Sequence, residues 1–338
     1  VEQPGSSNNL VSSKYMVRAI NKKRALFMDK ASLYPHDLDF TALEDLADWQ
    51  WFDKANPGDI GHSLQQAEII VSNKVVLDRP ILEQCENLEL ICVAATGFNN
   101  IDIGAAKERG VKVCNARAYA TASVVQHVFS LVLSLNRKLS SYHRAAIDGH
   151  WAQSDFFCCF GEPISDLEGK TLGIIGYGEL GKHVAKVAVG FGMDVIIARR
   201  NDTDKRAGRV PLERLLKQAD VVSLHCPLTK ANYHLISANE LSLMKPSAIL
   251  INTARGGLVD ESALLEALKN DEIAAAGLDV LEHEPPAVGD ALLDHHADNL
   301  IITPHIAWAS QQSRQRLLNE IVLNIQAYQS GQLRNAIL

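Results

Sequence analysis

From Arg24 onward, short apolar runs alternate with stretches in which apolar residues recur at helical spacing. The runs predict buried strands and the amphipathic stretches predict helices that join them, which is typical of α/β proteins with parallel sheets. A chain of 338 residues is longer than one ordinary domain. We therefore expect two α/β domains with doubly wound parallel sheets.

The first half of the chain is expected to contain short strands and helices. Its expected strands are Ala25–Met28, Glu68–Ser72, Leu88–Ala94 and Val111–Cys114. Its expected helices are Thr41–Ala47, Arg79–Glu86 and Ile103–Arg109. Gly110 stands where the last of these helices would end.

The second half alternates more regularly. Its expected strands are Thr171–Ile175, Asp194–Ala198, Val221–His225, Ala248–Asn252, Ala274–Asp279 and Leu300–Thr303. Its expected helices are Glu179–Phe191, Leu212–Lys217, Ser237–Met244, Glu261–Asn270 and Gln311–Ser330. Between the halves, Ala122–Leu135 is apolar nearly all round, which predicts a helix buried between two domains or two subunits. We interpret His127 on this helix as a structural residue.

Composition and charge narrow the function. The net charge of -7 argues against a nucleic-acid binder, which normally carries a basic surface. No apolar run approaches the ~20 residues of a membrane span. The six cysteines show no metal-ligand spacing, so we expect no metal and interpret them as reduced thiols of a cytoplasmic protein. Residues 1–15 are polar and are interpreted as a tag or disordered extension before Met16.

Gly176-Tyr177-Gly178-Glu179-Leu180-Gly181 matches the G-x-G-x-x-G pattern between an expected strand and an expected helix. In this pattern the first glycine permits a tight turn, the second lets a pyrophosphate approach the backbone, and the third lets the helix pack on the strand. The helix N-terminus at Glu179 and Leu180 would attract the negative charge. The alternative is a glycine-rich turn without a ligand.

The end of the next expected strand bears on the cofactor. A dinucleotide fold that binds NAD usually has an acidic residue there to bond the ribose 2′-hydroxyl. This chain has Arg199 and Arg200 instead, with no carboxylate to bond the hydroxyl or to repel a phosphate. Two guanidinium groups suit a 2′-phosphate, so we expect NADP in preference to NAD. The alternative is a pair of solvated arginines, one of them stacked on adenine.

Three later segments carry candidate catalytic residues at the carboxyl ends of expected strands, where open α/β sheets bind ligands. They are Asn252–Gly257, which contains Arg255, Gly277–Pro286, which contains Glu284, and Thr303–Trp308, which contains His305. An arginine beside two glycines is suited to bind a carboxylate in a forked geometry. A histidine is suited to supply a proton near neutral pH. Each residue also has a structural alternative: an anchor for Arg255, a turn residue for Glu284 and a buried loop residue for His305.

With the glycine loop, these segments resemble the D-isomer-specific 2-hydroxyacid dehydrogenase family, over about Arg24 to Ala327. Ala95–Asp102 resembles the family's substrate-carboxylate loop, and Ser123–His127 also matches, although Gln126 replaces the usual glutamate. The resemblance implies a nicotinamide-dependent enzyme that adds a hydride to C2 of a 2-keto acid and a proton to its oxygen. It also implies two Rossmann-like doubly wound parallel-sheet domains with an active-site cleft between them. They are a substrate domain of flavodoxin type, residues 16–120 and 306–338, and a dinucleotide-binding domain, residues 121–305.

The resemblance further implies a role for each site residue. His305 supplies the proton, Glu284 stabilises and orients the imidazolium, and Arg255 binds the substrate carboxylate and polarises the keto oxygen. Other implied binding residues are Thr96 and Gly97 for the substrate carboxylate and Cys226, Pro227, Thr253, Ala254 and Asp279 for the cofactor, with Asp279 accepting from the nicotinamide carboxamide. Glu282 and His283 are expected to be exposed loop residues, and Trp308 either caps the substrate pocket or packs at a hinge.

Within the family, Trp151–Pro163 and Leu172–Gly181 look like glycerate dehydrogenases, also called hydroxypyruvate reductases. Asn73–Val76 is similar too and brings Lys74 near the expected substrate mouth. We therefore expect reduction of hydroxypyruvate or glyoxylate to D-glycerate or glycolate, by a homodimer with Ala122–Leu135 as a contact helix. The alternatives are a reductase of another small 2-keto acid and a nucleotide-sensing, corepressor-like binding protein on the same fold.

Overall fold

The computed structural model describes residues 22–201, 203–204 and 206–337. The expectation for residues 1–15 therefore lies outside the described residues. The chain divides into two compact units. Unit 1 comprises the residues up to Ser32, Phe40–Asn115 and the residues from Val322, and unit 2 comprises Leu33–Asp39 and Ala116–Ile321.

Unit 1 is built on a five-stranded parallel sheet in the order β2-β1-β3-β4-β5, which is the flavodoxin-like order. Its strands are β1 (Arg24–Phe27), β2 (Asp48–Trp51), β3 (Ile69–Ser72), β4 (Leu90–Val93) and β5 (Lys112–Cys114). Its helices include α1 (Thr41–Glu44), α2 (Gly61–Gln66), α3 (Arg79–Gln84) and α4 (Ile103–Glu108). β3 and β4 are buried along their whole length, as central parallel strands are when both faces are covered.

Unit 2 contains a seven-stranded parallel sheet in the order β12-β11-β10-β9-β6-β7-β8. The strands are β6 (Thr171–Ile175), β7 (Asp194–Ala198), β8 (Arg209–Val210), β9 (Val221–Leu224), β10 (Ile249–Asn252), β11 (Ala275–Leu278) and β12 (Leu300–Ile302). Counted from β6, this is the Rossmann order with one additional strand. The order reverses between β6 and β9, and the carboxyl ends at such a switch point are where open α/β sheets bind ligands.

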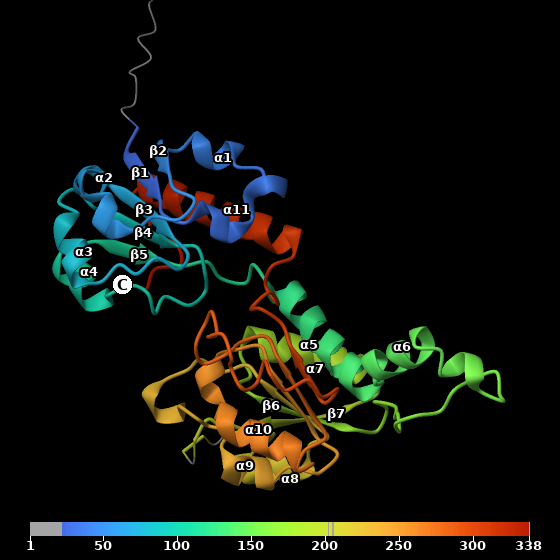
Figure 1. The fold of residues 1–338 in the computed structure, drawn as a ribbon. Coiled ribbons are helices and arrows are strands. Elements are labelled where there is room, and N and C mark those ends of the chain that lie inside the picture. Colours follow the sequence, from blue (N-terminus) through green and yellow to red (C-terminus); the bar gives the residue numbers. More distant parts are fainter. Residues whose placement is uncertain (1–21, 202, 205, 338) are drawn as a thin grey trace, which may run out of the picture. The chain divides into compact units, whose positions relative to one another are not determined.

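Helices cover both faces of the unit 2 sheet (Figure 1). α8 (Leu212–Gln218), α9 (Ala238–Ser242) and α10 (Glu261–Lys269) lie on one face, and α5 (Thr121–Asn136) and α7 (Glu179–Gly190) lie on the other. α11 (Gln311–Gln329) begins in unit 2 and ends in unit 1. Leu131 of α5 would lie 3.1 Å from a Cβ on Gly277 of β11, so the glycine lets this helix approach the sheet. The side of α5 that faces the sheet is therefore covered within unit 2 itself.

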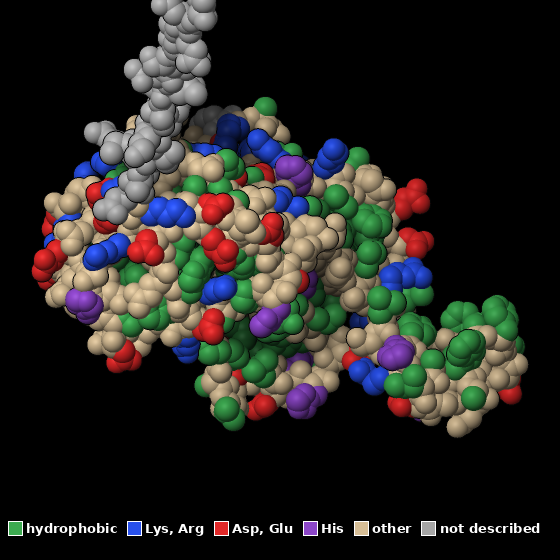
Figure 2. Space-filling view, turned by 90° about the horizontal axis from the view of Figure 1, so that it is seen from above, with side chains coloured by type: hydrophobic (Ala, Val, Ile, Leu, Met, Phe, Trp, Pro, Cys, Tyr) green, Lys and Arg blue, Asp and Glu red, His purple; other side chains and the backbone are tan. Residues whose placement is uncertain are grey.

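The segment after α6 (Leu139–Ile147) exposes large apolar side chains. Phe156, Phe157 and Phe160 are 74%, 92% and 87% exposed. Figure 2 shows hydrophobic side chains gathered over this segment, at the right of the view. Monomeric soluble proteins rarely expose apolar side chains in such groups, so the segment has the character of a contact surface.

The predicted α/β architecture with two parallel sheets is confirmed. Two strands were not predicted, β2 and β8, and both lie at sheet edges. β2 and β8 contain no buried residue, and β8 has only two residues, so they leave little apolar signal in the sequence. The helix predicted over Thr41–Ala47 ends at Glu44, and that over Ser237–Met244 spans Ala238–Ser242. Among the described residues, no helix is long and apolar enough to cross a membrane.

Candidate active site

The glycine loop joins β6 to α7 at the switch point of the unit 2 sheet. Gly176 has a φ of +99°, and a Cβ on it would lie 2.5 Å from the backbone of His225 and Cys226. A Cβ on Gly181 would overlap the carbonyl of Gly176, whereas a Cβ on Gly178 would meet nothing within 4 Å. The first glycine thus makes the turn, the third packs the helix on the strand, and the second is open to a ligand. A pyrophosphate fits this opening at the N-terminus of α7.

The end of β7 differs from the expectation in one respect. The carboxylate of Asp204 accepts the backbone N–H of Arg200 at 3.1 Å and pairs with Arg206 at 2.7 Å. The expectation of no carboxylate at this strand end was therefore wrong, because a short turn folds Asp204 back onto it. The Arg206 guanidinium holds the pKa of Asp204 well below its usual range. The negative charge of Asp204 is thus paired with Arg206, and not with Arg199 or Arg200.

Arg209 is a further arginine beside the glycine loop. Its guanidinium carbon lies 4.8 Å from the ring centre of Tyr177, a cation–π contact. The pairing of Ile197 with Arg209 brings it there, from the two-residue edge strand β8. Sequence reasoning missed Arg209 because so short a strand has no recognisable pattern.

His305 and Glu284 form a hydrogen-bonded pair. Nδ1 of His305 lies 2.6 Å from Oε2 of Glu284, and Oε1 of Glu284 accepts the N–H of Leu281 at 3.0 Å. The two side chains are 30% and 35% exposed, so a substrate has access to them. Since Nδ1 faces the carboxylate, Nε2 is the ring nitrogen that remains for proton transfer.

Asp279 holds the backbone after His305 and a side chain before it. This residue is 1% exposed, and its carboxylate accepts the N–H groups of Ile306 at 2.9 Å and Ala307 at 2.8 Å. It also accepts the Thr303 hydroxyl at 2.6 Å. His305 has a φ of +53°, which costs a non-glycine residue on the order of 1 kcal/mol and persists only where the surroundings enforce it. The expected contact of Asp279 with the nicotinamide carboxamide stays a prediction.

Arg255 lies in the loop after β10. Its Nη1 donates to the carbonyl of Ala254 at 2.6 Å. A Cβ on Gly256 would overlap the backbone of Leu281, so this loop packs directly on the segment that leads to Glu284. The structure therefore brings together, within unit 2, the loops that carry Arg255 and Glu284. Glu284 in turn is hydrogen-bonded to His305.

Two buried polar atoms at the same sheet edge have no hydrogen-bond partner among the described residues, Nδ1 of His225 and Oγ1 of Thr253. The pairing of β9 with β10 places Leu224 beside Asn252, so these residues are the next positions on neighbouring strands. Burial lowers the pKa of His225 to about 4, which keeps its ring neutral. Unpaired buried polar groups are rare and costly. Their place at the switch point fits a bound polar group such as a dinucleotide.

Cys226 and Pro227 follow His225 and are held by Asn232. The Asn232 amide donates to the carbonyl of Pro227 at 2.8 Å, and its nitrogen lies 3.8 Å from the sulfur of Cys226. Burial raises the pKa of the Cys226 thiol. Asn232 thus fixes the backbone at Cys226 and Pro227, and their contact with the cofactor stays a prediction.

The His305 loop is held by contacts that involve its own Trp308 and the side chains of Tyr119 and His127. The Trp308 indole donates to the carbonyl of His305 at 2.9 Å, and its ring meets Tyr119 edge-on at 6.3 Å. Burial raises the pKa of Tyr119 to about 12, against the opposing effect of the Arg255 charge. Nε2 of His127 lies 2.9 Å from the Thr303 hydroxyl. Tyr119 was missed because a single tyrosine before a helix carries no chemical pattern.

Lys74, Thr96 and Gly97 lie at the carboxyl edge of the unit 1 sheet. The buried carboxylate of Asp29 accepts the N–H of Lys74 at 2.6 Å, and the Asn115 amide donates to the carbonyl of Thr96 at 2.7 Å. Lys74, Thr96 and Gly97 therefore belong to unit 1, whereas the three predicted catalytic residues, two of which are also predicted to bind substrate, belong to unit 2.

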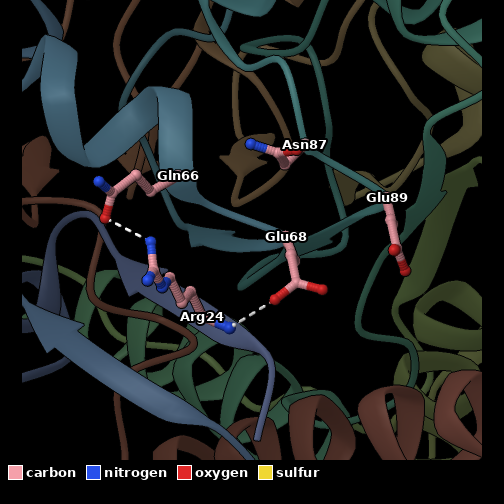
Figure 3. A pocket seen from close by; sticks show the side chains of 5 residues that line it. All are labelled: Arg24, Gln66, Glu68, Asn87 and Glu89. Carbon is pink, nitrogen blue, oxygen red and sulfur yellow. Dashed lines mark hydrogen bonds between the residues drawn. The ribbon is translucent and has the colours of Figure 1, made fainter. Parts of the chain in front are cut away.

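The amino edge of the unit 1 sheet carries a pocket of about 310 Å³ (Figure 3). It is lined by Arg24, Gln66, Glu68, Asn87 and Glu89. Its polar groups largely bond one another: Glu68 accepts the N–H of Arg24 at 2.9 Å, and Lys23 bridges Glu68 and Glu89. None of the predicted site residues lies in it. Among the described residues, no group of three His, Cys, Asp or Glu side chains is arranged to hold a metal ion.

The chain is similar to known proteins in sequence and in structure. The sequence profile of the D-isomer specific 2-hydroxyacid dehydrogenase NAD binding domain matches residues 129–307. The chain is 44% identical to a glycerate dehydrogenase of Methylorubrum extorquens, over 93% of this chain and 99% of that protein.

Two solved structures illustrate the range of similar proteins. A D-lactate dehydrogenase from Aquifex aeolicus, complexed with NAD and lactic acid, is 32% identical with a TM-score of 0.77, over 91% of this chain and 96% of that one. An NADPH-dependent glyoxylate/hydroxypyruvate reductase from Sinorhizobium meliloti, in complex with NADP and malonate, is 27% identical with a TM-score of 0.80, over 94% and 97%.

Proposed function

Because the chain belongs to the D-isomer specific 2-hydroxyacid dehydrogenase family, we propose that it reduces hydroxypyruvate or glyoxylate with a preference for NADPH. The chain is an oxidoreductase of this family that uses a nicotinamide cofactor, and the family acts on small 2-keto and 2-hydroxy acids. The observation that carries the proposal is the His305–Glu284 pair, held at the sheet edge that also presents the glycine loop.

In the proposed reaction, Nε2 of His305 donates a proton to the oxygen on C2 of the keto acid. Glu284 stays bonded to Nδ1, so it fixes the tautomer and stabilises the ring while it is charged. Arg255 binds the substrate carboxylate and polarises the keto oxygen. When bound, the nicotinamide cofactor supplies the hydride that adds to C2.

The preference for NADPH rests on charge at the end of β7. Arg199, Arg200 and Arg209 contribute three guanidinium groups there, and the carboxylate of Asp204 is matched by Arg206. A 2′-phosphate suits such a site because arginine binds phosphate with forked, charge-assisted bonds. One solved relative contains NADP and another contains NAD, so the arginines of this chain are the basis of the choice.

The substrate class rests on the relatives and on unit 1. A glycerate dehydrogenase and a glyoxylate/hydroxypyruvate reductase are among the similar proteins. We propose that Lys74 and the backbone N–H groups of Thr96 and Gly97 bind the substrate carboxylate. On this proposal unit 1 is the substrate domain and unit 2 is the dinucleotide-binding domain, whose cofactor contacts include Cys226 and Asp279.

We also propose a homodimer in the cytoplasm. The exposed phenylalanines after α6 would be covered by a second copy, in addition to the predicted contact through α5. All six cysteines are free thiols, which suits a reducing compartment.

A substrate panel tests the proposed function. The purified protein is mixed with NADPH or NADH and with hydroxypyruvate, glyoxylate or pyruvate, while the nicotinamide absorbance is followed. We expect turnover with at least the first two acids and faster rates with NADPH. Tight cofactor binding without turnover of any small 2-keto acid would refute the reductase, and a strong NADH preference would refute the role of the arginines.

A further inference from the structure

Glu282 lies two residues before Glu284, and its carboxylate is held by two ring side chains. The Tyr233 hydroxyl donates to one oxygen, and Nε2 of His234 lies 3.2 Å from the other. The Glu282 side chain is 23% exposed, so the expectation of an exposed loop residue was wrong for it. The two rings come from a segment 48 to 49 positions earlier in the chain, which no local pattern reveals.

The same two residues also contact the loop that carries Arg255. The N–H of His234 donates to the carbonyl of Gly257 at 2.8 Å. A Cβ on Gly257 would lie 3.3 Å from the ring of Tyr233, so this glycine sits against the ring. The Arg255 loop is therefore contacted by the backbone of His234 and by the ring of Tyr233. The Glu284 segment is contacted by the Tyr233 hydroxyl and the His234 ring nitrogen.

The two loops contact each other as well. A Cβ on Gly256 would overlap the backbone of Leu281 and Glu282. The N–H of Leu281 donates to one oxygen of Glu284, whose other oxygen bonds His305 at 2.6 Å. A shift of the backbone at 281–282 would therefore move the hydrogen bond that orients Glu284.

Further contacts restrict the rings and the carboxylate. The rings of Tyr233 and His234 stack with their centres 3.9 Å apart, and Nδ1 of His234 lies 3.8 Å from a carboxylate oxygen of Asp260. The N–H of Glu282 donates to Glu261 at 2.6 Å. The Tyr233 hydroxyl and His234 hold the pKa of Glu282 below its usual range, so its carboxylate stays charged between them.

We propose that Tyr233, His234 and Glu282 form a positioning cluster that holds the Arg255 loop and the Glu284 segment in one arrangement. The cluster acts on catalysis through Glu284, which it places against His305. This role rests on the proposed function of Glu284 and His305, whereas the holding of the two loops does not depend on any activity.

The holding of the loops is tested by amide hydrogen exchange. Tyr233 is 51% exposed, so Tyr233→Phe removes the hydroxyl without opening a core. We expect faster exchange in both 255–259 and 281–284 in this variant and in Glu282→Gln. The matched control is Tyr142→Phe, which removes a hydroxyl that donates to the carbonyl of Glu162 at 2.8 Å, away from both loops. Unchanged exchange in both loops would overturn the cluster, whatever the activity.

The action through Glu284 is tested by a double-mutant cycle. We expect Tyr233→Phe to lower kcat roughly tenfold in the otherwise unchanged protein, with little further loss when Glu284 is already glutamine. A merely structural role predicts the same factor in both backgrounds, and that result or an unchanged kcat would contradict the positioning role. Should the unsubstituted protein bind NADPH yet reduce no 2-keto acid, while the exchange changes are present, the proposed function alone would fail.

Discussion

Each of the two sheets has a buried aspartate at its carboxyl edge, and this aspartate holds the loop that follows a neighbouring strand. In unit 1, Asp29 follows β1 and accepts N–H groups from Asn73 and Lys74, after β3. In unit 2, Asp279 follows β11 and accepts N–H groups from residues after β12, in the His305 loop. In each unit the loop so held carries a residue predicted to act on the substrate.

The two aspartates differ in what else they bond. The Asp279 carboxylate accepts the hydroxyl of Thr303, which His127 contacts in turn, so side chains from the loop after β12 and from α5 hold it in place. Asp29 is held by backbone N–H groups, and burial raises its pKa above the usual value in spite of them. The Asp279 carboxylate is thus part of a side-chain network that holds the His305 loop, whereas the Asp29 carboxylate holds the Lys74 loop through backbone N–H groups. We infer that kcat depends on the exact position of the His305 loop in unit 2, and that it depends less on the Lys74 loop in unit 1.

Among the substitutions that test this comparison, the largest effect is expected for Asp279→Asn. The amide would turn a donor toward the N–H of Ala307 and free the His305 loop, and a displacement of about 1 Å can cost ~100-fold in rate. We expect kcat to fall by about that factor, with a stability loss of about 1–3 kcal/mol. Steady-state kinetics and thermal unfolding measure the two.

The matched control is Asp220→Asn at the amino edge of the same sheet. Asp220 also accepts a backbone N–H, from Thr171 at 2.8 Å, and pairs with Lys245. It should lose stability while keeping kcat. If both variants lose kcat equally, the distinction between the two edges is refuted.

A smaller and different effect is expected for Asp29→Asn. Loosening the Lys74 loop should raise KM for the keto acid roughly tenfold and leave kcat within about threefold, because substrate binding and not proton transfer is disturbed. Kinetics with hydroxypyruvate measure the split. Glu68→Gln, at the amino edge of unit 1, serves as the control and should change neither constant. A fall in kcat as large as that of Asp279→Asn would contradict the comparison.

A still smaller effect is expected for Thr253→Val, which removes an unpartnered buried hydroxyl. If the cofactor uses this atom, its Kd should rise roughly fivefold, in the range of a single hydrogen bond. The free energy of unfolding without cofactor should stay the same or rise, because no bond within the described chain is lost. Titration of NADPH fluorescence and chemical unfolding measure both. A stability loss with unchanged affinity would show that the hydroxyl serves the fold.

The smallest effect is a pH dependence of stability. Burial raises the pKa of Asp29 in the folded protein, so the native state holds this proton more tightly than the unfolded state does. The stabilisation is therefore fully present at low pH and is lost as the pH rises through the folded pKa. We expect the unfolding free energy of the unsubstituted protein, relative to Asp29→Asn, to fall as the pH rises above 3.8. A relative rise would contradict the burial of this charge.

The same contrast shows what the sequence could predict. The glycine loop, Arg255, Glu284 and His305 were identified because each lies in a short local pattern. Asp29, Arg209 and the Tyr233 cluster were missed because their roles arise from strand pairing or from contacts between distant segments. Asp279 was found, but its bonds to the His305 loop depend on the neighbouring strand. Candidate catalytic residues can be recognised from local sequence patterns, whereas the residues that hold them in position can be recognised only from the folded structure.

The most direct test of the central claim is the rate of hydride transfer in His305→Gln, measured by stopped flow with NADPH and hydroxypyruvate. The glutamine keeps a polar side chain but cannot donate a proton near neutral pH, so we expect the rate to fall by about 10²–10⁴ while NADPH affinity is nearly unchanged. A rate close to that of the unsubstituted protein would show that the proton comes from another group.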